Sequence, residues 1–236
     1  MKKIIHKAND RGYADHGWLK SYHSFSFADY WDDEKINFGM LRVLNDDVVK
    51  AGMGFGTHGH DNMEIVSIPL SGSLAHKDST GTAETIRTND VQIMSAGTGI
   101  RHSEFNASET EAVNFLQIWI MPKERNIKPR YDQQTYSPEE RHNRLLTVVS
   151  PEKSEKSLWI NQDAYFSIGN FDLGKVIDYK IKNQSHGVYI FLIDGEVKVA
   201  ETNLQKRDSI GIWETDSVSI EATKNSQLLI IEVPMN

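Results

Sequence analysis

Two histidines, His58 and His60, stand one residue apart in the stretch GFGTHGHDNMEIVSIPLSG, residues 54–72. Alternate residues of a β-strand point to the same face, about 6.6 Å apart along the strand, so these imidazoles can converge on one metal ion. Glycines in the same stretch leave room for a close approach of the backbone to that ion. The pair alone does not distinguish a metal site from an ordinary strand surface.

A second pair, His102 and Glu104, has the same spacing after a glycine-rich turn in MSAGTGIRHSEFN, residues 94–106. On facing strands, the two pairs would supply three imidazoles and one carboxylate. Such a set leaves one or two positions of a five- or six-coordinate ion open, which favours catalysis or small-molecule binding over a closed structural site. The chain has no cysteine, and nitrogen and oxygen ligands suit Fe(II), Mn, Ni, Cu(II) or Zn.

The elements that must position these residues are short strands. Runs rich in β-branched and aromatic residues, separated by Gly, Asn, Asp or Ser clusters, predict an all-β fold of sandwich or barrel type. The predicted strands span residues 36–44, 63–70, 91–97, 112–121, 145–150, 186–193 and 227–233. One helix is expected at 137–145, with Ser137 as the N-cap, Pro138 as the first helical residue and Glu140 as the capping-box partner.

The two halves of the chain resemble each other. Residues 70–94 and 193–212 each contain a strand, a turn ending in Gly, a second strand, and then Asp90 or Asp208 opening another strand. A duplicated β-barrel explains this pattern, and so does a chance recurrence of ordinary hairpin sequences. We expect an N-terminal metal-binding domain at residues 1–125, a polar linker at 126–143 and a C-terminal domain at 144–236.

Composition excludes several classes of protein. The net charge of -7 argues against a nucleic-acid partner, because a phosphate-binding protein needs a basic face. No segment approaches the ~20 apolar residues of a membrane span, and the basic start of the chain lacks the apolar stretch of a signal peptide. We therefore expect a cytoplasmic protein without a membrane partner. Nothing in the sequence signals oligomerisation, and a monomer is expected.

The histidine-bearing stretches resemble a known family. Gly52, His58, His60, Glu64 and Gly72 look like the first cupin motif with its last gap slightly stretched. Gly99 and His102 look like the second cupin motif, with Gly97 standing where cupins have proline. A narrower resemblance is to the pirins, including the bacterial pirin-like quercetinases. The blocks that carry it are residues 16–32, which contain HSFSFADY, and residues 38–47, 54–81 and 89–106.

The resemblance to pirins implies a bicupin, a fold of two β-barrels with the metal in the N-terminal barrel. It implies as metal ligands His58, His60, His102 and Glu104. Ordinary cupins use the glutamate of the first motif, here Glu64, as a ligand. Pirins use the one that follows the second-motif histidine. The spacing of Glu104 from His102 favours the pirin assignment, which leaves Glu64 a supporting role.

The C-terminal barrel is expected to be a degenerate cupin without metal. If Asp208 aligns with Asp90, then Ile220 and Ala222 fall at the positions of His102 and Glu104. Neither side chain can bind an ion. The remaining histidine of that barrel, His186, stands alone.

Pirin-like bacterial proteins are associated with quercetin 2,3-dioxygenase activity, which opens a flavonol ring with O2 and releases carbon monoxide. The resemblance implies a small aromatic substrate such as a flavonol, and O2 as co-substrate. It implies Fe(II) as the cofactor, with Ni, Mn, Cu, Zn or Co as alternatives. Glu104 would then act as the catalytic base. Two rival functions remain: a non-catalytic, redox-sensing metal protein that acts on transcription factors, and a cupin with another small-molecule activity.

A flavonol is flat and aromatic, so its pocket should have apolar walls. Four residues close to the motifs are candidates for this lining, with ordinary barrel core as the alternative: Phe55, Met63, Phe105 and Trp119. The HSFSFADY segment is expected to shape or cap the edge of the domain through His23, Phe25, Phe27 and Asp29.

Overall fold

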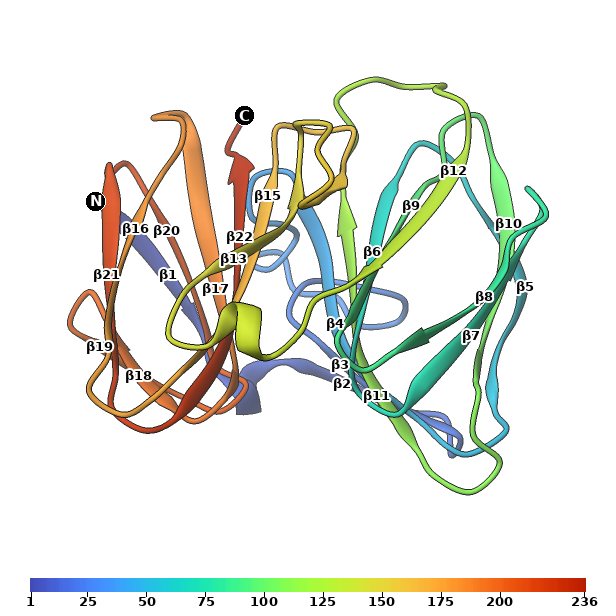
Figure 1. Cartoon of the computed structure of the whole chain (residues 1–236), viewed down its shortest axis with the longest axis horizontal. Helices are drawn as coiled ribbons and strands as arrows, with labels where there is room; N and C mark the ends of the chain where they lie inside the picture. The colour runs from blue at the N-terminus through green and yellow to red at the C-terminus, as the bar shows by residue number, and fades with distance from the viewer.

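The computed structural model describes residues 1–236 and consists almost entirely of β-strands. Two β-barrels lie side by side, and each combines a seven-stranded sheet with a four-stranded sheet (Figure 1). The helical segments are two 3-10 turns, η1 (Ala8–Asp10) and η2 (Glu139–Arg141). Neither turn comes near the length of a membrane-spanning helix. The predicted all-β bicupin fold is confirmed.

The N-terminal barrel contains the stretches with the motif histidines. In spatial order its seven-stranded sheet consists of β12 (Arg130–Thr135), β9 (Asp90–Ser95), β6 (Glu64–Ser71), β11 (Val113–Ile120), β4 (Leu41–Val49), β3 (Leu19–His23) and β2 (Gly12–Asp15). Its four-stranded sheet consists of β5 (Gly54–His60), β10 (Ile100–Asn106), β7 (Ser73–Asp78) and β8 (Ala83–Arg87).

The C-terminal barrel repeats this arrangement. Its seven-stranded sheet consists of β1 (Lys2–His6), β20 (Ser209–Trp213), β17 (His186–Asp194), β22 (Ser226–Pro234), β15 (Tyr165–Phe171), β13 (Leu146–Ser150) and β14 (Leu158–Trp159). Its four-stranded sheet consists of β16 (Val176–Lys180), β21 (Ser217–Ala222), β18 (Glu196–Val199) and β19 (Thr202–Gln205).

The turn that precedes β9 has a counterpart before β20. Asp90 accepts a hydrogen bond from the backbone N–H of Arg87 at 2.7 Å, and Asp208 accepts one from Gln205 at 3.0 Å. In both cases the donor lies three residues before the aspartate.

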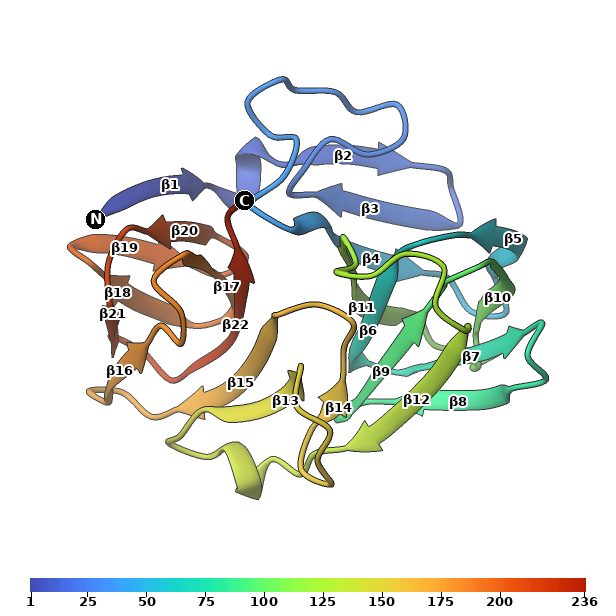
Figure 2. The same cartoon turned by 90° about the horizontal axis from the view of Figure 1, so that it is seen from above.

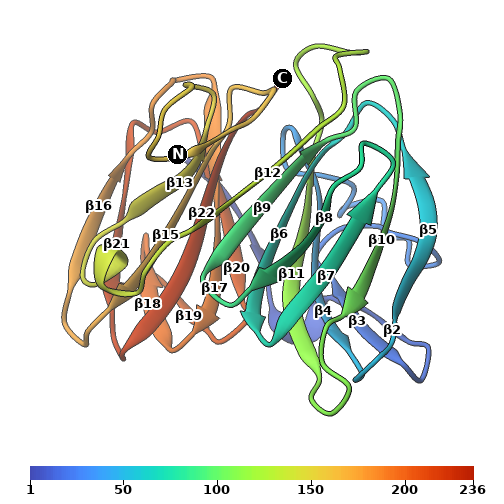
Figure 3. The same cartoon turned by 45° about the vertical axis from the view of Figure 1, so that its right-hand side comes forward.

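The largest apolar core lies between the barrels rather than inside one of them. The two seven-stranded sheets face each other, and the four-stranded sheets lie on the outside (Figures 2 and 3). A cluster of 25 buried residues joins them, drawing Val66 and Ile118 from one barrel and Phe166 and Ile231 from the other. Each seven-stranded sheet is therefore covered on both faces, which explains its long runs of β-branched residues.

The two barrel interiors differ in polarity. A cluster of 15 apolar residues fills the C-terminal barrel and includes Ile220 and Ala222 on β21. The equivalent strand of the N-terminal barrel is β10, which carries His102 and Glu104 at the matching place between two neighbours. The apolar residues there form only two small clusters, of six and four residues. The space between those clusters is lined by polar side chains.

Strand pairing departs from the predicted domain limits at two places. Residues 126–143, expected to be a linker, contain β12, which pairs with β9 at the edge of the N-terminal barrel. Residues 2–6, expected in the N-terminal domain, form β1, which pairs with β20 of the C-terminal barrel. The N-terminal barrel thus extends to residue 135, and the C-terminal barrel is completed by a strand from the start of the chain.

The helix predicted at 137–145 is wrong, although its capping hydrogen bonds form. The backbone N–H of Ser137 donates to Glu140 Oε2 at 2.9 Å, and the N–H of Glu140 donates to Ser137 Oγ at 3.4 Å. Only the single turn η2 follows, because Asn143 adopts a φ of 55° and β13 begins at Leu146. A left-handed residue so close to the cap ends any helix.

The strand predicted at 36–44 is displaced, since the observed β4 spans Leu41–Val49. Phe38 and Leu41 instead bracket a turn in which Gly39 has a φ of 53°. The strand continues through Asn45, Asp46 and Asp47, which resemble loop residues by type. The other predicted strands agree with the observed ones to within two residues at each end.

Candidate metal centre and aromatic cavity

Three imidazoles meet inside the N-terminal barrel. His58 and His60 lie on β5, and His102 lies on the neighbouring β10, paired in register with His58. His102 Nε2 is 3.0 Å from His58 Nε2 and 3.0 Å from His60 Nε2. The structure therefore brings together three of the four residues that the sequence marked as candidate ligands.

The spacing of these nitrogens fits a metal ion. Imidazole nitrogens bind Zn²⁺, a typical divalent metal, at about 2.0–2.1 Å, so two such ligands at right angles lie about 3.0 Å apart. His58 Nδ1 donates to the carbonyl of Gly56 at 2.8 Å, which leaves the Nε2 lone pair of His58 free for the ion. Burial, reinforced by neighbouring imidazoles, lowers the pKa of His60 to about 4 and that of His102 to about 3. Both rings are thus held in the neutral form that binds metals.

A third pair with i, i+2 spacing, His76 and Asp78 on β7, lies behind His102. Both side chains are fully buried, and His76 Nε2 lies 3.0 Å from Asp78 Oδ2. Donation from Nε2 leaves His76 Nδ1 as an acceptor, and this atom is 3.4 Å from His102 Nδ1. His76 was not among the predicted ligands, although its spacing from Asp78 matches that of the other two pairs.

Glu104 lies beside the imidazole cluster rather than within it. Its Oε2 accepts a hydrogen bond from Gln117 Nε2 at 2.9 Å, and its Oε1 lies 3.5 Å from the hydroxyl of Ser67. A carboxylate oxygen of Glu104 and one ring nitrogen each of His76 and His102 all lie within 4.8 Å of one another. Burial, together with the charge of Asp47, raises the pKa of Glu104 to about 7.

Glu64, the competing carboxylate, points away from this site. Its Oε2 accepts hydrogen bonds from Ser95 Oγ at 2.8 Å and from the backbone N–H of Asn161 at 3.1 Å. Asn161 belongs to the other half of the chain, so Glu64 faces the junction between the barrels. Ser67, three residues further along β6, faces the interior and approaches Glu104, as the alternation of a strand requires.

A cavity of about 310 Å³ opens beside the cluster, and Glu104 and Gln117 form part of its wall. Phe55 and Trp119 line it, as expected. The Trp119 ring lies with its centroid 5.0 Å from that of His60 and 5.4 Å from that of Phe27. Trp119 therefore connects the aromatic walls of the cavity to the imidazoles.

The other two lining predictions are wrong. Met63 packs against the four-residue apolar cluster around Ile65, and Phe105 is 40% exposed. Neither residue lines the cavity. Phe105 is adjacent to Glu104 in sequence and so points to the opposite face of β10.

The HSFSFADY segment has a larger part in the cavity than capping an edge. His23, Phe27 and Asp29 all line the cavity, whereas Phe25 is buried in the core between the barrels. Several further polar residues of the wall were not predicted, among them Ser21, Asn45 and Asp47. Their signal in the sequence is the alternation of β3 and β4, which places residues 21, 23, 45 and 47 on the inner face.

Comparison with known proteins agrees with this architecture. Residues 5–120 match the family described as Pirin, and residues 147–233 match the quercetinase C-terminal cupin domain. Quercetin 2,3-dioxygenase from Escherichia coli K12 is 41% identical over 230 residues, which cover 98% of each chain. A pirin-like protein from Caulobacter vibrioides is 35% identical over 222 residues, covering 94% of this chain and 95% of that relative.

A solved structure gives the same result. The bacterial pirin YhhW from Escherichia coli, in complex with nickel(II), is similar to this chain with a TM-score of 0.94 and 40% identity, over 99% of both chains. The paired barrels, the inward-facing histidines and the similarity along the whole sequence lead to one conclusion: this chain belongs to the pirin family.

Proposed function

We propose that this pirin is a metal-dependent dioxygenase of the quercetinase type, which opens the ring of a flavonol with O2. The observation that carries the proposal is that the imidazole cluster and the cavity lie next to each other. Glu104 lines the cavity and also lies against His102. A flat substrate in the cavity would therefore lie next to a metal ion held by the imidazoles. Relatives named quercetin 2,3-dioxygenase support the same assignment.

The residues that would hold the ion are His58, His60 and His102, with Glu104 as the fourth ligand. Fe(II) is the metal we propose, while nickel(II) is present in the related YhhW structure. The same donors accept Ni, Mn, Cu, Zn or Co, because nitrogen and oxygen ligands discriminate weakly among these ions. A metal ion bound there would act as a Lewis acid and would orient the reactants.

The side chains of the chain itself supply proton transfer and positioning. Gln117 holds Oε2 of Glu104, so Oε1, beside the hydroxyl of Ser67, would both contribute to the metal site and accept the proton of a substrate hydroxyl group. The rings of Phe27, Phe55 and Trp119 give the cavity apolar walls that bind a flat aromatic molecule and exclude water.

The decisive experiment measures O2 consumption by the Fe(II)-loaded protein in the presence of quercetin. We expect uptake that requires quercetin and is lost in His102→Ala. His142→Ala is the matched control, since the His142 side chain is 58% exposed and its Nε2 lies 3.4 Å from Asp172 in the other barrel. Absence of uptake by protein shown to contain iron would overturn the proposal and leave a non-catalytic, redox-sensing role.

A further inference from the structure

Four buried polar side chains line the cavity without any part in the proposed reaction. They come from β3 and β4, in the sheet opposite β10, and are Ser21, His23, Asn45 and Asp47. None is more than 4% exposed. Burying polar groups is costly unless they are hydrogen-bonded, so the partners of each atom indicate what the site accepts.

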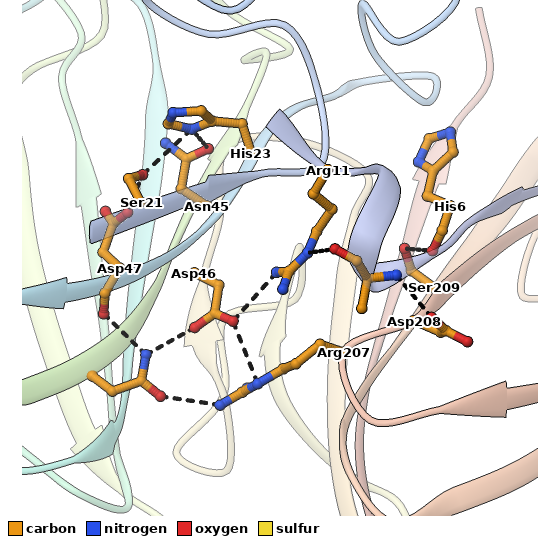
Figure 4. Close-up of polar contacts among 12 residues, drawn as sticks. His6, Arg11, Ser21, His23, Asn45, Asp46, Asp47, Arg207, Asp208 and Ser209 are labelled. Atoms are coloured by element: carbon orange, nitrogen blue, oxygen red, sulfur yellow. Dashed lines mark hydrogen bonds and ion pairs between the residues drawn. The ribbon is translucent and has the colours of Figure 1, made fainter. Parts of the chain in front are cut away.

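Some polar atoms of these four side chains have hydrogen-bond partners within the protein. Ser21 Oγ donates to Asp47 Oδ1, and His23 Nδ1 lies 2.9 Å from Asn45 Oδ1 (Figure 4). Asp47 Oδ2, His23 Nε2 and Asn45 Nδ2 have no partner in the protein. Because Nδ1 of His23 donates to the amide oxygen, and burial lowers the pKa of this histidine, Nε2 is a bare acceptor. Burial raises the pKa of Asp47 to about 7, so above that pH the ionised Asp47 and the neutral His23 present two acceptors to the cavity, beside the amide donor of Asn45.

The strand that carries Asp47 is held rigidly from its other face. Asp46 ion-pairs with Arg11 at 3.2 Å and with Arg207 at 3.3 Å, and Figure 4 shows its carboxylate beside both guanidinium groups. Asn114 Nδ2 donates to Asp46 Oδ1 at 2.8 Å and to the backbone carbonyl of Asp47 at 2.9 Å. A side chain supported in this way is pre-organised for ligand recognition.

Aromatic rings surround the two acceptors. The His23 ring lies 5.4 Å from that of Phe27 and is stacked at 6.3 Å on that of Tyr30. A ligand that reaches Asp47 and His23 must therefore be flat where it passes these rings and must carry hydrogen-bond donors at its end. A hydroxylated aromatic ring has both properties.

We propose that Asp47 and His23 form a hydroxyl-binding subsite, which selects substrates with hydroxyl groups on an aromatic ring other than the one that reacts. This inference rests on the proposed function, because it takes the reacting hydroxyl to lie at Glu104. A ligand without the distal hydroxyl leaves two buried acceptors unpaired, and sites built to bind a hydroxyl reject such analogues strongly.

The test compares, at pH 8, equilibrium binding of quercetin, which has hydroxyl groups on its pendant ring, with that of galangin, which has the same hydroxyl groups on the fused rings and none on the pendant ring. Holoprotein is titrated under nitrogen, and binding is followed by tryptophan fluorescence, because Trp119 lines the cavity. We expect quercetin to bind at least about tenfold more tightly, the effect of losing one hydrogen bond to a charged group. In Asp47→Asn and in His23→Phe this preference should fall to within roughly threefold.

Asp47→Asn and His23→Phe each test the subsite, so the test remains valid if one of the two variants fails to fold. Asp178→Asn, at an exposed position on β16, is the matched control for the loss of one carboxylate and should keep the full preference. Equal affinity of the wild type for both flavonols would overturn the subsite, as would variants that weaken both ligands equally. Separate O2-uptake measurements distinguish the two proposals: a binding preference without turnover removes the dioxygenase and keeps the subsite.

Discussion

Nδ1 of His76 lies 3.4 Å from Nδ1 of His102, so a histidine outside the candidate metal cluster contacts one inside it. Asp78 fixes the tautomer of His76, and His76 in turn directs the lone pair of His102 Nε2 towards His58 and His60. Partners of this kind orient ligands and raise their basicity, and their loss typically lowers metal affinity 10–100-fold.

His76→Phe should therefore weaken metal binding about 10–100-fold while the three ligand histidines stay in place. The measurement is competition for Ni(II) between the protein and a chelator of known affinity. His142→Phe, at an exposed position remote from the cluster, is the control. Wild-type affinity in His76→Phe would show that His102 needs no support from β7.

The two glutamates should respond differently to the same change. Glu64→Gln is expected to retain metal, because Glu64 contacts Ser95 and Asn161 at the barrel junction. Glu104→Gln should lose much of its metal, since it removes the carboxylate whose oxygen lies within 4.8 Å of ring nitrogens of both His102 and His76. Elemental analysis after dialysis decides the question. The reverse result would assign the fourth ligand to Glu64.

Glu64 should also make stability depend on pH. Burial raises its pKa from 4.5 to about 7, so between these values the folded protein binds more protons than the unfolded chain. The contribution of Glu64 to folding is thus fully present below pH 4.5 and is lost as the pH rises through 7, by on the order of 3 kcal/mol. Glu64→Gln lacks this loss and should gain stability relative to the wild type from pH 5 to pH 8.

Urea unfolding of the metal-free proteins at several pH values measures this difference. The control is Glu221→Gln, which makes the same chemical change at an exposed carboxylate on β21. If Glu64→Gln became relatively less stable with rising pH, Glu64 would have to be ionised and stabilising at the junction.

The ion pairs at the barrel junction should be much more sensitive than those at the surface. The side chains of Asp46 and Arg11 are 7% and 5% exposed. Asp46→Asn leaves Arg11 and Arg207 buried without a counter-charge, which should destabilise the protein by about 3–5 kcal/mol. Asp163→Asn breaks an exposed pair with Lys123 and should cost less than about 1 kcal/mol. Equal midpoints of urea unfolding for the two variants would contradict this expectation.

The cluster of candidate ligand histidines could be recognised from the sequence because the alternation of a strand is a local property. His58, His60 and His102 lie within two strands whose inner face is defined by spacing alone. His76 and Asp78 have the same spacing, but no glycine-rich turn precedes them, and their buried contact with His102 depends on the pairing of β7 with β10.

The polar wall of the cavity could not be predicted in the same way. The triplet Asn45-Asp46-Asp47 has the composition of a turn, and it becomes a strand only because distant residues satisfy it. Arg207 lies on the other barrel, and Ser21 lies on the neighbouring β3. Such long-range partners override local propensity, and they cannot be identified from the residues around position 46.

The pairing of β1 with β20 has a consequence for biosynthesis. Partners such as His6 and Ser209 are separated by 203 residues along the chain. At about 5–20 residues per second, the ribosome needs roughly 10 to 40 seconds to deliver β20 after β1 has been made. During that interval β1 is an unpaired strand, and its two lysines, Lys2 and Lys3, discourage pairing with other chains. The C-terminal barrel can therefore close only after β20 has been synthesised. The rate of translation, and not the β-propensity of β1, determines when this strand pair forms.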